Sequence, residues 1–132
     1  MPRHPPPNIT KHQCLTVLLC LQHGLTLKRI APFFHLSKRG LVRWIEEGKK
    51  GNKPYKRFYT AYNHGKGLKN LNNALRIYEE MQDKDIDRQL VVYESIKNAQ
   101  LAIIDAALSQ LGISYKDYRN YYKDMKKRLN QI

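Results

Sequence analysis

The segment from residue 27 to residue 45, LKRIAPFFHLSKRGLVRWI, has the apolar spacing of two short helices that share a small core. Leu41, Trp44 and Ile45 recur at three- and four-residue intervals, so they line one face of the second helix. That face needs apolar partners from the first helix and the turn. Ala31 is expected where the two helices approach most closely, and the expected shared core is Ile30, Phe34, Leu36, Leu41, Trp44 and Ile45.

The ends of these two helices are marked by residues that favour caps and turns. Ser37 is expected to cap the second helix, and Gly48 is expected to stop it. Pro32 would cost about 3 kcal/mol inside the first helix unless that helix is short or kinked. His35 takes the turn position where glycine is common, and histidine tolerates a positive φ better than a β-branched residue does.

The outer face of the second helix is left to Lys38, Arg39, Val42 and Arg43. Two short helices with a shared core and a free basic face are the arrangement of a helix-turn-helix, whose second helix enters the major groove of DNA. The alternative is an ordinary pair of packed helices without a DNA-binding role.

The charge of the chain favours a polyanionic partner. The net charge is +13, and residues 1–66 hold thirteen lysines and arginines against two acidic residues, whereas residues 67–132 hold eleven against nine. Double-stranded DNA is a more plausible partner than a membrane, because the apolar run of residues 14–21 is far too short to cross a bilayer. The start, MPRHPPPNIT, lacks the layout of a secretory signal, so we expect a cytoplasmic protein, in the host cell if it is viral.

The predicted DNA contacts divide into two groups. Lys38, Arg39 and Arg43 are expected in the groove, and the surrounding basic residues on phosphates, although each of the latter could also be solvated surface charge. The predicted DNA-binding residues are Lys28, Arg29, Ser37, Lys38, Arg39, Arg43, Lys49, Lys50, Lys53, Lys56 and Arg57.

The whole chain is expected to be all-α. Besides the pair above, the predicted helices are 11–23, capped by Thr10 and closed by Gly24, then 55–63, 68–82, 85–111 and 115–129. The sequence HGKG at residues 64–67 is expected to break the chain between helices. This break divides a basic helix-turn-helix domain, residues 1–66, from a helical oligomerisation and partner-binding region, residues 67–132.

The predicted helix 85–111 is the basis for expecting a homo-oligomer. In LAIIDAALSQL, residues 101–111, eight of eleven residues are apolar, which surrounds the helix with apolar side chains. Few other elements are available to cover it, so other copies are expected to do so, the alternative being the centre of a monomeric bundle. The predicted interface residues are Val92, Ile96, Leu101, Ile103, Ile104, Leu108 and Leu111.

Catalytic, metal and cofactor sites are not expected. Cys14 and Cys20 lie six residues apart on one helix, which rules out a disulfide between them and favours two core thiols. Asp83, Asp85, Asp87 and Glu94 have the spacing of a calcium loop, but Arg88 replaces its required glycine, so capping of the next helix is preferred. No nucleophile with a neighbouring base is evident, and we expect no enzyme.

From Gly24, the order of elements in GLTLKRIAPFFHLSKRGLVRWIEEGKKGNKPYKRFYTAYNHGKG resembles the N-terminal domain of bacteriophage terminase small subunits. The matching residues are Trp44, Gly48, Tyr55, Phe58 and Ala61. The resemblance covers about the first half of the chain. The later segment EEMQDKDIDRQLVVYESIKNAQ is similar in layout to the helical hairpin by which members of that family assemble into rings.

The resemblance implies a non-catalytic DNA-packaging subunit. Such a subunit recognises viral DNA as a homo-oligomer, delivers it to the terminase large subunit and regulates the ATPase and nuclease activities found there. Basic domains arrayed around an oligomer would bind DNA multivalently and with strong dependence on salt. Two alternatives remain: a phage or mobile-element transcription regulator acting as a dimer, and the DNA-targeting subunit of a recombinase or transposase.

Overall fold

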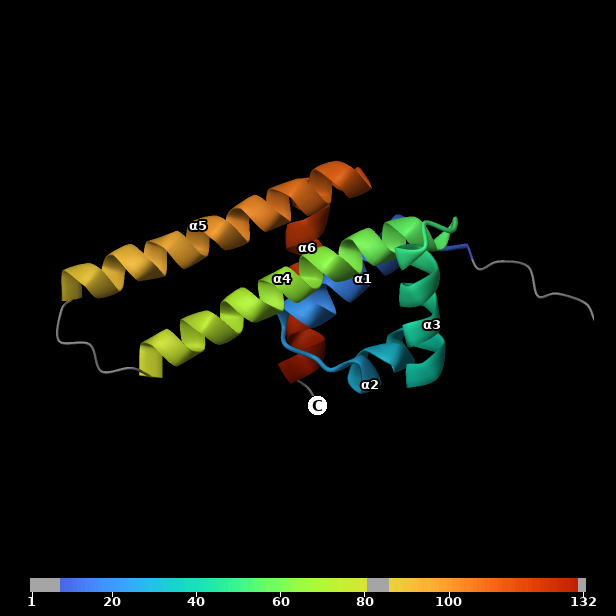
Figure 1. Ribbon diagram of the computed structural model, residues 1–132, viewed down its shortest axis with the longest axis horizontal. Helices are drawn as coiled ribbons and strands as arrows, with labels where there is room; N and C mark the ends of the chain where they lie inside the picture. Colours follow the sequence, from blue (N-terminus) through green and yellow to red (C-terminus); the bar gives the residue numbers. More distant parts are fainter. Residues whose placement is uncertain (1–7, 81–85, 131–132) are drawn as a thin grey trace, which may run out of the picture.

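The computed structural model describes residues 8–80 and 86–130, with the backbone alone for residues 86–89 (Figure 1). In these ranges the protein is all-α, with six α-helices, one 3-10 helix and no strand. The elements are α1 (Lys11–Gln22), α2 (Leu27–Ile30), η1 (Ala31–Phe34), α3 (Lys38–Lys49), α4 (Tyr55–Glu80), α5 (Ile86–Leu111) and α6 (Tyr115–Asn130).

Helix α1 is the most enclosed element of the fold. The Thr10 hydroxyl accepts a 3.2 Å hydrogen bond from the Gln13 backbone, and the Gln13 side chain accepts one of 2.9 Å from the Thr10 backbone, which together cap the helix as predicted. Gly24, with a φ of 83°, follows its last turn. Helices α4 and α6 pack on α1, which lies beside α4 in Figure 1. Its buried residues are Cys14, Leu15, Val17, Leu18, Leu19, Cys20 and Leu21.

Helix α4 runs without interruption through residues 64–67, so the predicted break at HGKG is wrong. Gly65 is buried where α4 crosses α1: a Cβ atom there would lie 2.8 Å from Leu21 Cδ1 and 3.3 Å from Leu18 Cα. The glycine therefore allows two helices to approach closely instead of ending one of them. Tertiary packing outweighs the cost of about 1 kcal/mol that glycine has inside a helix.

Helices α4 and α5 form an antiparallel hairpin whose far end extends beyond the rest of the molecule (Figure 1). Polar side chains connect the hairpin to α1 and α6. The Asn72 amide donates a 2.6 Å hydrogen bond to the Gln22 carbonyl and accepts one from the Gln100 amide, while the Tyr118 hydroxyl donates at 2.7 Å to the Gln22 side chain. Gln22 thus joins three helices at the base of the hairpin.

The joint between α5 and α6 consists of a glycine turn and a serine cap. Gly112 has a φ of 67°, and the Ser114 hydroxyl accepts a 3.1 Å hydrogen bond from the Asp117 backbone at the start of α6. Tyr118 and Met125 of α6 are buried in the same core cluster as residues of α1 and α3. The core is therefore shared by residues on both sides of the predicted division at residue 66, and the two-domain organisation stays a prediction.

Candidate functional site

The chain from Leu27 to Phe34 accommodates Pro32 by changing helix type. Helix α2 ends at Ile30, and Pro32 lies in the first positions of the 3-10 helix η1, where a missing N–H costs little. His35 then adopts a left-handed conformation, with a φ of 56°, and its N–H donates to the Pro32 carbonyl at 3.1 Å. The predicted tight turn at His35 is confirmed.

An aromatic cluster holds α3 against the start of α4. The Phe58 ring of α4 lies edge-on to Trp44 of α3, with 5.3 Å between centroids, and to Phe34 of η1, at 5.4 Å. Phe58 is fully buried. The predicted core residues Ile30, Phe34, Leu41 and Ile45 are buried, and Leu36 and Trp44 pack partly buried against the same cluster. Ala31, expected at the close approach of the two helices, is buried as well.

Gly48 does not stop α3, which continues to Lys49, and this prediction is wrong. Gly48 is buried against α4, and a Cβ atom on it would lie 2.4 Å from the Tyr55 carbonyl oxygen. Gly51, with a φ of 85°, instead follows the end of the helix. The close approach at Gly48 and the aromatic cluster together fix the direction in which α3 presents its outer face.

The outer face of α3 carries three cations and one carboxylate. The Ser37 hydroxyl caps the helix by accepting a 3.1 Å hydrogen bond from the Gly40 backbone, as predicted. Lys38, Arg39 and Arg43 are exposed. The residues that share this open face are Lys38, Arg39, Val42, Arg43 and Glu46. Glu46 was not anticipated, although its position one helical turn beyond Val42 places it on that face.

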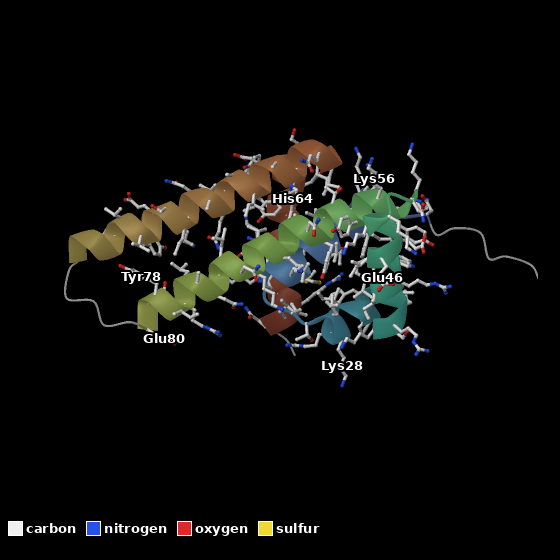
Figure 2. The ribbon with its side chains drawn as sticks, viewed as in Figure 1. Lys28, Glu46, Lys56, His64, Tyr78 and Glu80 are labelled. Carbon is white, nitrogen blue, oxygen red and sulfur yellow. The ribbon has the colours of Figure 1, made fainter. Side chains whose placement is uncertain are left out.

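The other predicted DNA-binding residues are also exposed. They lie on α2, at the end of α3, in the loop that follows α3 and at the start of α4. Lys28 and Arg29 belong to α2, Lys49 ends α3, Lys50 and Lys53 lie between α3 and α4, and Lys56 and Arg57 lie in the first turn of α4. In Figure 2, Lys28 and Lys56 point away from the protein at opposite ends of α3. Lys50 forms a 3.7 Å ion pair with Glu47.

A pocket of about 520 Å³ brings three of these cations together with residues distant in sequence. Lys53, Lys56 and Arg57 line it on the α4 side, and Gln110 reaches it from the last turn of α5. The complete lining is Asn8, Ile9, Lys53, Pro54, Lys56, Arg57, Thr60 and Gln110. Sequence reasoning missed Asn8, Ile9, Thr60 and Gln110, because no local pattern places the end of α5 beside the start of α4.

The predicted oligomer-interface residues lie in different environments. Ile104, Leu108 and Leu111 are buried in the chain's own core, so they offer no surface to a second copy. Val92, Ile96 and Ile103 are half-buried, and Leu101 is 53% exposed. Other large apolar side chains of the hairpin that are exposed were not predicted, namely Ile77, Leu90 and Val91.

Burial favours the neutral forms of two cysteines and two histidines. Burial raises the pKa of Cys14 to about 11, although nearby Arg57 lowers it, and burial raises the pKa of Cys20 to about 12. Both cysteines are free and buried, as predicted. Burial lowers the pKa of His23, and Lys126 lowers it further; burial alone lowers the pKa of His64.

Within the described part of the chain, no group of three potential metal ligands is found, and no helix has the length and apolar character needed to span a membrane. Asp83 and Asp85 of the calcium-loop spacing lie outside the described residues, as does the Asp87 side chain. Comparison of the chain with protein-family models, curated proteins and solved structures found no match.

Proposed function

We propose that this protein is a non-catalytic DNA-binding subunit in which η1 and α3, with α2 before them, act as a helix-turn-helix. The observation that supports this most directly is the exposed face of α3, where Lys38, Arg39 and Arg43 extend from a helix fixed on its other side by the Phe58 cluster. A rigid helix with a basic outer face is suited to the major groove, where arginine can bind guanine in a bidentate manner.

In this mechanism the remaining cations bind the phosphates on either side of the groove. Lys28 and Arg29 of α2 and the basic residues that follow α3 flank the face of α3. Glu46 would repel phosphates from the end of that face and could accept a hydrogen bond from a cytosine amino group. The base contacts supply specificity, whereas the phosphate contacts supply affinity that falls as salt rises.

The same proposal includes assembly into a homo-oligomer, and the protruding α4–α5 hairpin supports it. Ile77 is 56% exposed, Leu90 55% and Val91 63%, and all three lie on helices that extend beyond the body of the molecule. Together with the resemblance of the first half to terminase small subunits, this favours a viral DNA-packaging role in which the oligomer delivers DNA to the terminase large subunit and regulates it.

The DNA-binding proposal is tested by replacing Arg39 and Arg43 with alanine in the full chain. Loss of two base contacts is expected to cost about 1–3 kcal/mol each and to reduce discrimination between DNA sequences. The matched control is Lys116→Ala with Arg119→Ala, which removes two exposed cations from α6. Equal DNA affinity of the Arg39/Arg43 variant and the unmodified protein, measured by fluorescence anisotropy at one salt concentration, would reject α3 as the recognition helix.

The packaging role is tested by the absolute mass of the chain, from light scattering coupled to size exclusion at two salt concentrations. A discrete assembly of more than about four copies is expected for a packaging subunit. A dimer that binds two half-sites about one helical turn apart would instead favour a transcription regulator. Binding to a terminase-type ATPase would argue against the DNA-targeting subunit of a recombinase or transposase.

A further inference from the structure

The pocket at the start of α4 differs from the face of α3 in its composition and in the number of chain segments that form it. Three segments form it: residues 8–9, residues 53–60 and Gln110 of α5. Its volume is about 520 Å³, and it combines separate segments of the chain, whereas the residues around the outer face of α3 all belong to one helix. The side chains around it include three cations and no carboxylate.

The charge of this pocket is not neutralised by the protein. Within the described residues, 8–80 and 86–130, the ion pair found is that of Lys50 with Glu47. It does not involve Lys53, Lys56 or Arg57. The Arg57 guanidinium is close enough to the buried Cys14 thiol to oppose the effect of burial on its pKa.

The neutral polar groups complete a surface suited to an oxyanion. Asn8 and Gln110 provide side-chain amides that can donate hydrogen bonds, whereas the Thr60 hydroxyl already donates to the Lys56 carbonyl at 3.1 Å. Arginine binds phosphate through paired N–H donors, and lysine contributes a mobile point charge. The volume exceeds that of a single phosphate and leaves room for an attached sugar.

We propose that the pocket formed by Lys53, Lys56, Arg57 and Gln110 binds the phosphate group of a nucleotide. The phosphate belongs either to the backbone of bound DNA or to a free nucleotide. Binding of a DNA backbone phosphate rests on the proposed DNA-binding function, whereas binding of a free nucleotide does not. In both cases the pocket is a second site that requires α5 to be docked on α4, because Gln110 reaches it only in that arrangement.

The test uses the full-length, isotope-labelled chain titrated with inorganic phosphate and followed by amide NMR. We expect saturable shifts at Ile9, Thr60 and Gln110 that sodium chloride at equal ionic strength does not reproduce. K56Q with R57Q should weaken phosphate binding about tenfold or more. K116Q with R119Q removes the same charge from α6 and should leave the binding unchanged. K53Q removes one cation from the loop before α4, where no helix is interrupted, so it should weaken phosphate binding less and retain the fold.

Absence of saturable shifts, or equal shifts in the K56Q/R57Q variant with an unchanged circular dichroism spectrum, would overturn the proposal. Addition of duplex DNA then identifies the source. Displacement of phosphate by DNA supports a backbone contact, and simultaneous binding supports a free nucleotide. If the unmodified chain binds phosphate in this pocket but does not bind DNA, the proposed DNA-binding function is rejected and the phosphate site is retained.

Discussion

Gly48 of α3 and Tyr59 of α4 approach so closely that a Cβ atom on Gly48 would lie 2.4 Å from the Cβ of Tyr59. The same atom would lie 2.4 Å from the carbonyl oxygen of Tyr55, which is backbone and cannot turn aside. The spacing of the two helices therefore depends on the absence of a side chain at residue 48. Because α3 carries the candidate DNA-binding face, this contact links the packing of the core to the position of that face.

Gly48→Ala is expected to destabilise the protein by about 1–3 kcal/mol or more, because the added methyl group has no space. Gly40→Ala is the matched control within the same helix. A Cβ atom on Gly40 would lie 3.4 Å from the flexible Leu36 side chain, so this change should stabilise the helix by up to about 1 kcal/mol. Urea unfolding of both variants measures the difference, and equal free energies of unfolding would contradict the close approach.

Phe58→Ala is expected to cost about 3–5 kcal/mol, because a fully buried aromatic ring is lost from the contact between α3 and α4. The protein has a single tryptophan, Trp44, whose ring lies 5.3 Å from Phe58, so its fluorescence should report the change directly. Tyr93→Ala, at a position 41% exposed, should change stability by less than about 0.5 kcal/mol. A Phe58 variant as stable as this control would show that the cluster does not hold α3.

Local sequence patterns predicted the elements whose determinants are close together in the chain. The caps at Thr10 and Ser37, the left-handed turn at His35 and the core face of Leu41 and Ile45 all appear in the structure. Each of these depends on hydrogen bonds or periodicity within a few residues. Their physical cause is therefore present in the local sequence.

Features that depend on distant contacts were not predictable in this way. Gly48 and Gly65 look like helix breakers in the sequence, but in the structure each permits one helix to cross another closely. Similarly, the sequence pointed to residues 101–111 of α5 as the helix most in need of cover, yet α1 is the more enclosed helix and Leu101 of α5 is exposed. The pocket that includes Gln110 depends on the same long-range arrangement.

The two cysteines are expected to be unreactive in the folded protein. Both are buried, and burial raises the pKa of Cys14 to about 11 and that of Cys20 to about 12, so the reactive thiolate is scarce at pH 8. A disulfide reagent such as Ellman's should label neither thiol rapidly in buffer and both in guanidinium chloride. Rapid labelling of the native chain would contradict the enclosed position of α1.

His23 is expected to make the protein less stable as the pH falls below about 6.5, the ordinary pKa of histidine. Its ring lies 4.9 Å from that of Tyr122, and its Nε2 atom is buried without a hydrogen-bond partner in the described structure. Burial and Lys126 lower its pKa in the folded state, so the unfolded chain binds more protons between the folded and unfolded pKa values. Stability is then complete above the unfolded pKa and decreases as the pH falls through that window.

His23→Phe retains an aromatic ring beside Tyr122 but cannot bind a proton, so its stability should decrease less between pH 7 and pH 5 than that of the unmodified chain. Some pH dependence should remain, because burial also lowers the pKa of His64. His35→Asn, a change at an exposed histidine in a left-handed turn that asparagine tolerates, should leave the pH dependence unaltered. Thermal unfolding across this pH range measures all three proteins. If the His23 variant followed the pH dependence of the unmodified chain, its ring would not be the group that resists protonation in the folded core.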